Sequence, residues 1–467
     1  MLRKTDFFIG ETPADKVNYF MTTPYYIALI IALTAISNLF GAELIVYTLF
    51  ALTAAFVCIL GKDLLPLIPM IACGYLTPSV KNNPGKNPDS IFSSAGGGIW
   101  VGILAAIIAG ALIYWVVRNR KNIFHTKYPL LPGMLLLSAT YLLGGIGSNG
   151  YFDHALQSMF FAALNGLVLF VPYILLTSGI DWKNARKDYL AWTGFGIGCL
   201  LLCEIAWIYL TSGVISNGTI DRTRIYTGWG MYNNIGSYLA MMIPFPFYLA
   251  TRYHNGWIGT LAGSLFMLGV VLTCSRASIL CGGGIWFLCV VLMLYFAYNR
   301  HTSVYIVAYF VGGILVLVML FGEQLLQLFK PLLSQGLDPS NRDDIYVKGL
   351  KLFLKYPLFG GSFFSTEYTP WGWSTNAAFS GLIPPRWHNT YVQLLASCGF
   401  FGLAAYTQHR LQTVKIFAHS RNPEKIFIAC SLVVLLATSL FDCHFFNLGP
   451  VMFYSMALAF AENIKEK

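Results

Sequence analysis

Long apolar runs, separated by short polar connections, recur along most of this 467-residue chain. Hydrophobic residues make up 56% of it and charged residues 11%, whereas a soluble domain has roughly 45–50% and about 25%. The longer runs reach the roughly 20 residues that an α-helix needs to cross a bilayer. Backbone groups in hydrocarbon must pair within their own segment, which favours helices. The runs predict an all-α polytopic membrane protein and exclude an ordinary soluble enzyme or a disordered chain.

We expect fourteen membrane spans, or twelve if the last two runs form a re-entrant pair. The apolar runs cover approximately residues 25–40, 44–60, 64–78, 97–117, 129–147, 156–180, 190–211, 231–250, 257–275, 277–298, 304–322, 389–406, 426–441 and 445–460.

The distribution of basic residues predicts the orientation. With the N-terminus inside, nineteen of the 30 lysines and arginines fall on the inside and five on short outside connections. The other six lie in one long outside segment, 323–387, and long segments do not obey the charge rule. Cytoplasmic loops carry such an excess, so the net charge of +10 needs no nucleic-acid partner. We expect both termini in the cytoplasm and three parts: membrane helices over 1–322, one long outward-facing segment over 323–387, and C-terminal membrane helices over 388–467.

The outward-facing segment predicts an amphipathic helix. Ser340 or Asn341 can cap it, and Pro357 ends it. One of its faces carries lysines, namely Lys348, Lys351 and Lys355. Such a helix either lies on the membrane surface near anionic head groups or covers the bundle with solvated lysines. The following Gly-, Pro- and aromatic-rich stretch, 360–387, indicates an irregular lid.

Ionisable residues at a membrane are costly and mark candidate functional sites. Those near the outer face are Arg222, Arg224, Arg276, Arg342, Arg386 and His388. Arg276 lies between two apolar runs with almost no loop, so its guanidinium must face the bundle interior or a wet cavity. Arginine suits bidentate recognition of phosphate. The alternative is a structural arginine that pairs with a carboxylate or caps a helix.

His388 stands just before an apolar run, beside Arg386. A neutral imidazole there can accept a proton, or the residue can be an ordinary surface or capping histidine. Glu204 lies inside a span and either supports a site or pairs with an arginine. The turn Asp442–His444 either joins the site or is solvated. No metal-binding pattern occurs, and we expect no metal and no cofactor.

Four motifs resemble the O-antigen ligase and polymerase superfamily. The stretch from Arg386 through His388 and Asn389 to Leu403 is similar to its histidine–asparagine signature, which continues to a Gly-x-x-Gly-Leu end. Residues 342–360 resemble its arginine-to-PLFG stretch, with Tyr346 where tryptophan is usual. The segment 275–277 resembles its Ser-Arg-Ala element, and 224–240, which includes Asn234, its arginine-to-asparagine element.

The resemblance implies a GT-C-like glycosyltransferase of the bacterial inner membrane, which acts on the outer face on undecaprenyl-diphosphate-linked glycans. It implies that His388 is the general base and that Arg276, with Arg224 or Arg222, holds the diphosphate. Arg342 and Arg386 are then secondary contacts, and Asn234, Asn389 and Glu204 are supporting residues. Transfer is expected to be inverting and metal-independent.

The sequence leaves the identity of the acceptor open. A lipid A core acceptor makes the chain a ligase, which we favour, whereas a second lipid-linked repeat makes it a polymerase. A protein acceptor is a third version with the same donor. A polysaccharide or anion transporter is the main rival from another class, but transport needs charges along a central pathway, and here the cations gather near one face. A non-catalytic scaffold is a further alternative.

Overall fold

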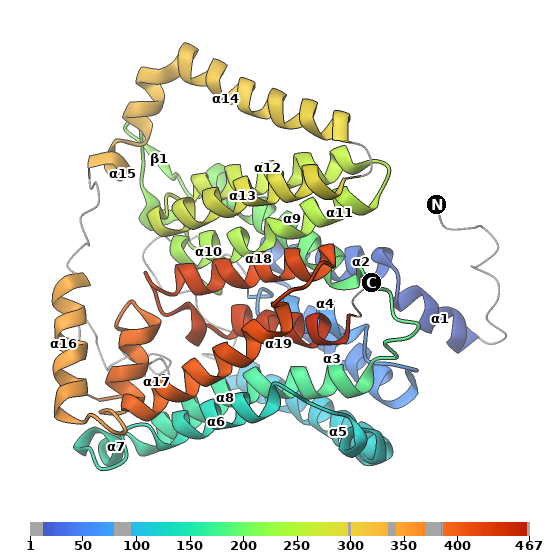
Figure 1. Ribbon diagram of the computed structural model, residues 1–467, viewed down its shortest axis with the longest axis vertical. Helices are drawn as coiled ribbons and strands as arrows, with labels where there is room; N and C mark the ends of the chain where they lie inside the picture. Colours follow the sequence, from blue (N-terminus) through green and yellow to red (C-terminus); the bar gives the residue numbers. More distant parts are fainter. Residues whose placement is uncertain are drawn as a thin grey trace. The chain divides into compact units, whose positions relative to one another are not determined.

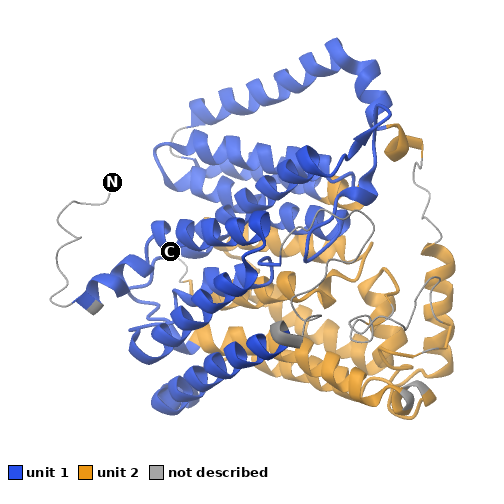
Figure 2. Ribbon diagram, turned by 180° about the vertical axis from the view of Figure 1, so that it is seen from behind, with its two compact units in different colours: residues 1–126, 178–275, 282–329 blue, residues 127–177, 276–281, 330–467 orange. Residues whose placement is uncertain are grey.

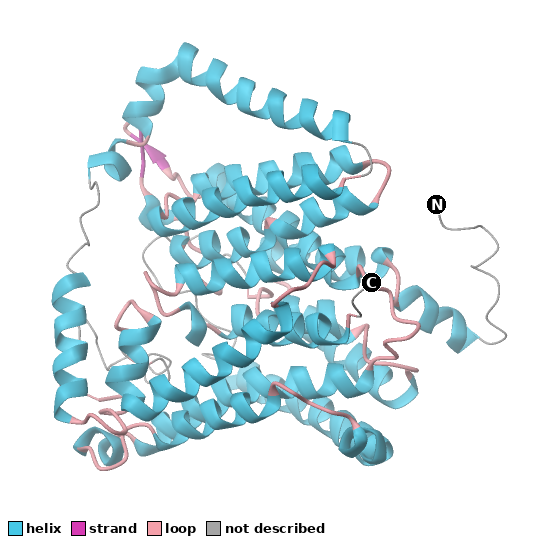
Figure 3. Ribbon diagram, viewed as in Figure 1, coloured by secondary structure: helices cyan, strands magenta, loops and turns pink. Residues whose placement is uncertain are grey.

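The computed structural model describes residues 13–78, 95–297, 300–334, 342–365, 367–368, 384 and 386–464. Most of these residues are helical, and one short hairpin is present (Figures 1 and 3). Within them, six helices are long and apolar enough to cross a membrane, or up to seven if one bent pair is counted as a single span. The predicted all-α membrane class is therefore confirmed.

The larger number of spans stays a prediction, because several apolar runs form short or broken helices. The run 129–147 gives α6 (Leu131–Leu143), and 257–275 gives α12 (Gly256–Leu272). The run 231–250 is divided into α10 (Tyr232–Met242) and α11 (Pro244–Arg252), since proline cannot continue the hydrogen-bond ladder of the preceding helix.

The chain divides into two compact units, which Figure 2 colours separately. Unit 1 comprises residues 1–126, 178–275 and 282–329. Besides α10, α11 and α12 it contains α1 (Pro13–Met21), α2 (Pro24–Phe40), α3 (Glu43–Leu60), α4 (Leu67–Gly74), α5 (Ala95–His125), α9 (Tyr189–Thr211), most of α13 (Arg276–Phe296) and α14 (Arg300–Leu328). Half of the most apolar window of α9 is buried and none of that of α14, so α9 is central to this unit and α14 peripheral.

A tight hairpin in unit 1 positions two of the predicted arginines. Strands β1 (Ile215–Ser216) and β2 (Thr219–Ile220) pair antiparallel. Asn217 and Gly218 join them with φ of 52° and 73°, values that an Asn-Gly turn of this kind requires. Asp221 then caps the short helix η2 (Arg222–Arg224) by accepting from the amide of Thr223.

Unit 2 comprises residues 127–177, 276–281 and 330–467. Besides α6 it contains α7 (Asn149–Asp153), most of α8 (Ala155–Gly179), α15 (Lys330–Ser334), α16 (Arg342–Lys355), α17 (Thr390–Phe417), α18 (Pro423–Thr438), η4 (His444–Phe446) and α19 (Leu448–Asn463). The predicted amphipathic helix is α16, which runs across the direction of α6 and α8 in Figure 1. Its expected caps, Ser340 and Asn341, and most of the expected lid lie outside the described residues.

Helix α17 is sharply broken at Gly399, whose φ is +65° and ψ −158°. Residues of the Pro-Leu-Phe-Gly stretch occupy the break: the amides of Phe400 and Phe401 donate to the carbonyls of Pro357 and Leu358. A Cβ on Gly399 would lie 2.4 Å from the Leu358 carbonyl oxygen. Only glycine fits this backbone conformation and this close approach, so two of the sequence motifs form one structural joint.

Candidate functional site

His388 lies in the turn that leads into α17, with a φ of +48°. Residues with a side chain rarely adopt this left-handed conformation, and strained backbone positions cluster at functional sites. Asn389 follows as the helix cap, and its side chain accepts from the amides of Tyr391 and Val392. The cap leaves the His388 side chain 38% exposed at the end of the helix.

Helix α16 supports this turn from one side. The hydroxyl of Tyr346 donates to the carbonyl of His388 at 3.1 Å. Close packing is possible because residue 349 is a glycine; a Cβ there would lie 3.1 Å from the ring of Trp387. Trp387 is 2% exposed and packs with Leu352 of α16. The Tyr346 hydroxyl therefore links α16 to the backbone of this turn.

The turn after α18 supports it from the other side. The amide of Thr390 donates to Ser439, and the side chain of Asn389 to the carbonyl of Leu440 at 2.9 Å. Arg342 donates from Nη1 to the carbonyl of Phe441 at 2.6 Å. Two predicted site residues, Asn389 and Arg342, thus hold the turn that carries Asp442.

Asp442 is the partner of the histidine. Its Oδ1 lies 3.4 Å from Nδ1 of His388 and accepts from the Cys443 amide at 2.7 Å. Burial raises the pKa of the Asp442 carboxyl, but its interactions with His388, His444 and Arg386 outweigh burial and hold that pKa well below the usual range. A charged carboxylate behind an imidazole fixes its orientation and stabilises the imidazolium.

Arg386 and His444 complete the cluster. Arg386 donates from Nη1 to Oδ1 of Asn447 at 2.6 Å, and the Asn447 amide lies 3.2 Å from Nδ1 of His444. Burial lowers the pKa of His444 to about 4, with Asp442 opposing and Arg386, Arg342 and His388 reinforcing the shift. His444 is therefore neutral around pH 7. The turn Asp442–His444 joins the site, which the sequence left open.

Arg276 begins α13, and the segment Arg276–Cys281 groups with unit 2, the unit that contains His388. It is half-buried. It lies in the first turn of the helix, where backbone N–H groups have no partner within the helix. Such a helix start favours anions, which agrees with the predicted phosphate contact.

Arg222 and Arg224 differ in their surroundings within unit 1. Arg224 is paired with Asp221, with Nε 3.2 Å from Oδ2, and it also donates to the carbonyl of Gly213. The guanidinium of Arg222 lies 5.1 Å from the ring centroid of Tyr232. The structure thus separates a paired arginine from one held by an aromatic face.

Glu204, in α9, is buried and accepts from Asn38 and, at 3.3 Å, from Nε1 of Trp229. The alternative that it pairs with an arginine is wrong, because both partners are neutral donors. Asn234 lies in the first turn of α10, where its backbone N–H donates to the carbonyl of Met231. Both residues belong to unit 1.

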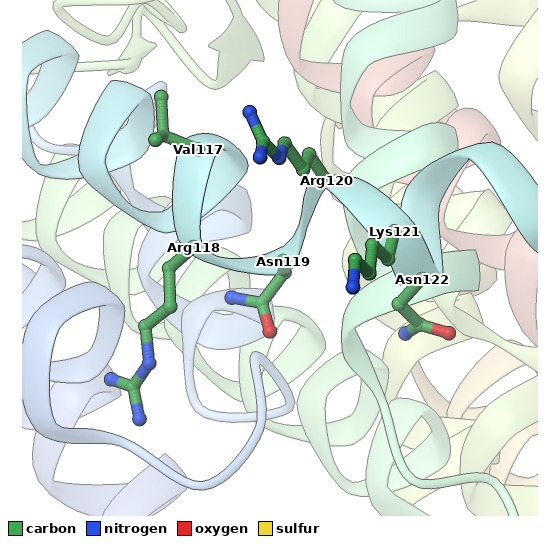
Figure 4. A pocket seen from close by; sticks show the side chains of 6 residues that line it. All are labelled: Val117, Arg118, Asn119, Arg120, Lys121 and Asn122. Atoms are coloured by element: carbon green, nitrogen blue, oxygen red, sulfur yellow. The ribbon is translucent and has the colours of Figure 1, made fainter.

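No group of three or more His, Cys, Asp or Glu side chains is arranged to hold a metal ion within the part of the chain that the structure describes. An open pocket at the end of α5 is lined by the successive residues Val117 to Asn122 (Figure 4). It contains none of the predicted site residues, and its cations are among those that the charge distribution assigns to the inside.

Residues 261–407 match the family model described as O-Antigen ligase. The matched segment includes Arg276, Arg342, Arg386, His388 and Asn389, whereas Asp442 and the arginines of η2 lie outside it. No curated protein matches the chain.

Proposed function

Because the chain belongs to the O-antigen ligase/polymerase superfamily through residues 261–407, we propose that it transfers a glycan from a lipid diphosphate to an acceptor hydroxyl. The donor is undecaprenyl-diphosphate-linked glycan, and the acceptor is the lipid A core, as in a ligase. The reaction takes place on the outer face of the bacterial inner membrane, with both termini in the cytoplasm. The pairing of His388 with Asp442 is the observation that carries this proposal.

His388 is the general base. Because Nδ1 lies 3.4 Å from Oδ1 of Asp442, Nε2 is the nitrogen left to accept the proton of the acceptor hydroxyl. The hydroxyl oxygen forms a bond to the anomeric carbon as the bond from that carbon to the diphosphate oxygen breaks. The proton resides on His388, whose positive charge the Asp442 carboxylate stabilises. Attack opposite to the leaving group inverts the configuration.

Arginines receive the negative charge of the departing diphosphate. Arg276 and Arg222 are the primary ligands, since the Arg224 guanidinium already has a carboxylate partner. Arg342 and Arg386 each use Nη1 in a structural hydrogen bond. A guanidinium has five N–H donors, so both retain donors for secondary contacts. No metal takes part in this scheme, and the reaction is expected to proceed in a chelator.

The test uses the purified chain, an undecaprenyl-diphosphate glycan and two acceptors, in buffer with EDTA. Ligase activity predicts glycosylated lipid A core and one free undecaprenyl diphosphate for each transfer. Products that grow only on a second lipid-linked glycan would make the chain a polymerase with the same donor chemistry. Failure with both acceptors, by protein that is folded and binds the donor, contradicts the proposal.

A further inference from the structure

Arg410 is a buried cation in unit 2 that sits among aromatic rings. Its Nη1 donates to the hydroxyl of Tyr454 at 2.7 Å. Nε and Nη2 are buried and have no hydrogen-bond partner among the described residues, and no ion pair to a carboxylate involves Arg410 there. A buried charge of this kind is costly unless its surroundings compensate it.

Three rings provide that compensation. The guanidinium carbon lies 4.5 Å from the ring centroid of Tyr406, 4.3 Å from that of Phe445 and 4.8 Å from that of Tyr454. The rings contact one another edge to face, with 5.3 Å between Tyr406 and Phe445 and 5.5 Å between Phe445 and Tyr454. We call these three rings the aromatic cage. The attraction between a cation and an aromatic face is stronger when the cation is removed from water.

The aromatic cage adjoins both halves of the candidate site. Tyr406 contacts the ring of Tyr391 at 5.6 Å, and Tyr391 follows His388 and Asn389 in the first turn of α17. The break at Gly399 makes this contact between the two halves of α17 possible. On the other side, Phe445 belongs to η4, directly after His444 and close along the chain to Asp442.

We propose that Arg410 is a positioning residue. By binding the three rings of the aromatic cage, it fixes the position of the His388 segment relative to the Asp442 segment. The proposal rests on the transferase function proposed above. The physical basis is the attraction of all three rings to one planar cation. A neutral side chain of similar length fills the same volume but does not attract the rings. Lysine retains the charge and part of the attraction.

The experiment compares Arg410→Met and Arg410→Lys in the transfer assay. We expect Arg410→Met to lower kcat at least tenfold with the donor KM within about twofold of wild type, because the arginines proposed for the diphosphate are untouched. Arg410→Lys should restore most of the rate. Lys415→Met is the matched control: it removes an exposed cation from the last turn of the same helix, and it should leave both parameters unchanged.

A double-mutant cycle with Asp442→Asn separates positioning from general stability. If Arg410 acts through the His388–Asp442 pair, Arg410→Met should cost little further rate once Asp442 is replaced. Full additivity, equal rates for wild type and Arg410→Met, or a large rise in donor KM would each overturn the proposal. An inactive wild type would instead refute the transferase function, and intact donor binding by each variant shows that it has folded.

Discussion

Nδ1 of His388 lies 3.4 Å from Oδ1 of Asp442, although one residue precedes α17 and the other follows α18. Hydrogen bonds from Thr390 and Asn389 to the end of α18 bring the two segments together. The distance between His388 and Asp442 therefore depends on these hydrogen bonds between the start of α17 and the end of α18.

Replacement of Asp442 by asparagine should lower kcat for glycan transfer by about 100-fold or more, the scale of a general-base contribution. Asparagine preserves the shape but removes the charge that stabilises the imidazolium. Initial rates with a labelled lipid-diphosphate glycan measure this loss. Asp344→Asn, at an exposed acid of α16 that pairs with Lys348, is the control and should retain the rate. A fully active Asp442→Asn would remove the carboxylate from the mechanism.

Arg222→Gln should weaken donor binding more than Arg224→Gln. Arg224 already pairs with Asp221, whereas the Arg222 guanidinium lies over the Tyr232 ring. A lost charged hydrogen bond of roughly 1.5–3 kcal/mol corresponds to about a tenfold or larger rise in the donor KM. Titration of each variant with lipid-diphosphate glycan gives the comparison. Equal effects, or a stronger effect at Arg224, would reverse the assignment.

Gly399→Ala should destabilise the protein by about 1–3 kcal/mol, as expected for a strained backbone position. The new Cβ would meet the Leu358 carbonyl at 2.4 Å, and the φ of +65° disfavours any side chain. Thermal unfolding in detergent measures the change. Gly312→Ala is the matched control, since a Cβ there meets nothing within 4 Å. Indistinguishable melting of the two variants would show that the break tolerates a side chain.

Acidification should destabilise the fold through His444. Its pKa is about 4 in the folded protein, against an ordinary value of 6.5, so the unfolded chain binds the proton first. Stability is then complete above about pH 6.5 and falls as the pH drops toward 4, by roughly 3 kcal/mol at about 1.4 kcal/mol per pKa unit. His444→Gln should flatten this part of the stability curve, while His301→Gln, at an exposed histidine, should not. An unchanged slope in His444→Gln would assign the effect elsewhere.

Features that depend on local sequence could be predicted. The apolar runs 44–60 and 190–211 correspond closely to α3 (Glu43–Leu60) and α9 (Tyr189–Thr211), because hydrophobicity and length decide such helices. The amphipathic helix over 342–355 also forms and ends before Pro357. His388 could be singled out because it is an ionisable residue next to an apolar run.

Features that depend on distant residues could not be predicted from the sequence. Asp442 lies in one of several polar turns, and nothing local distinguishes it. Its approach to His388 depends on hydrogen bonds between α17 and the end of α18. Glu204 suggested an arginine partner, but the fold supplies Asn38 and Trp229. Gly399 stood within an apolar run, and only the packing of Pro357 and Leu358 against it explains the broken helix.

The central claim is that His388 activates the acceptor hydroxyl. The most direct measurement compares single-turnover glycan transfer by wild type and His388→Ala, each purified, folded and saturated with lipid-diphosphate glycan, with lipid A core as acceptor. The account predicts product and free lipid diphosphate from wild type, and unreacted donor that stays bound to His388→Ala. Transfer by His388→Ala at the wild-type rate would contradict it.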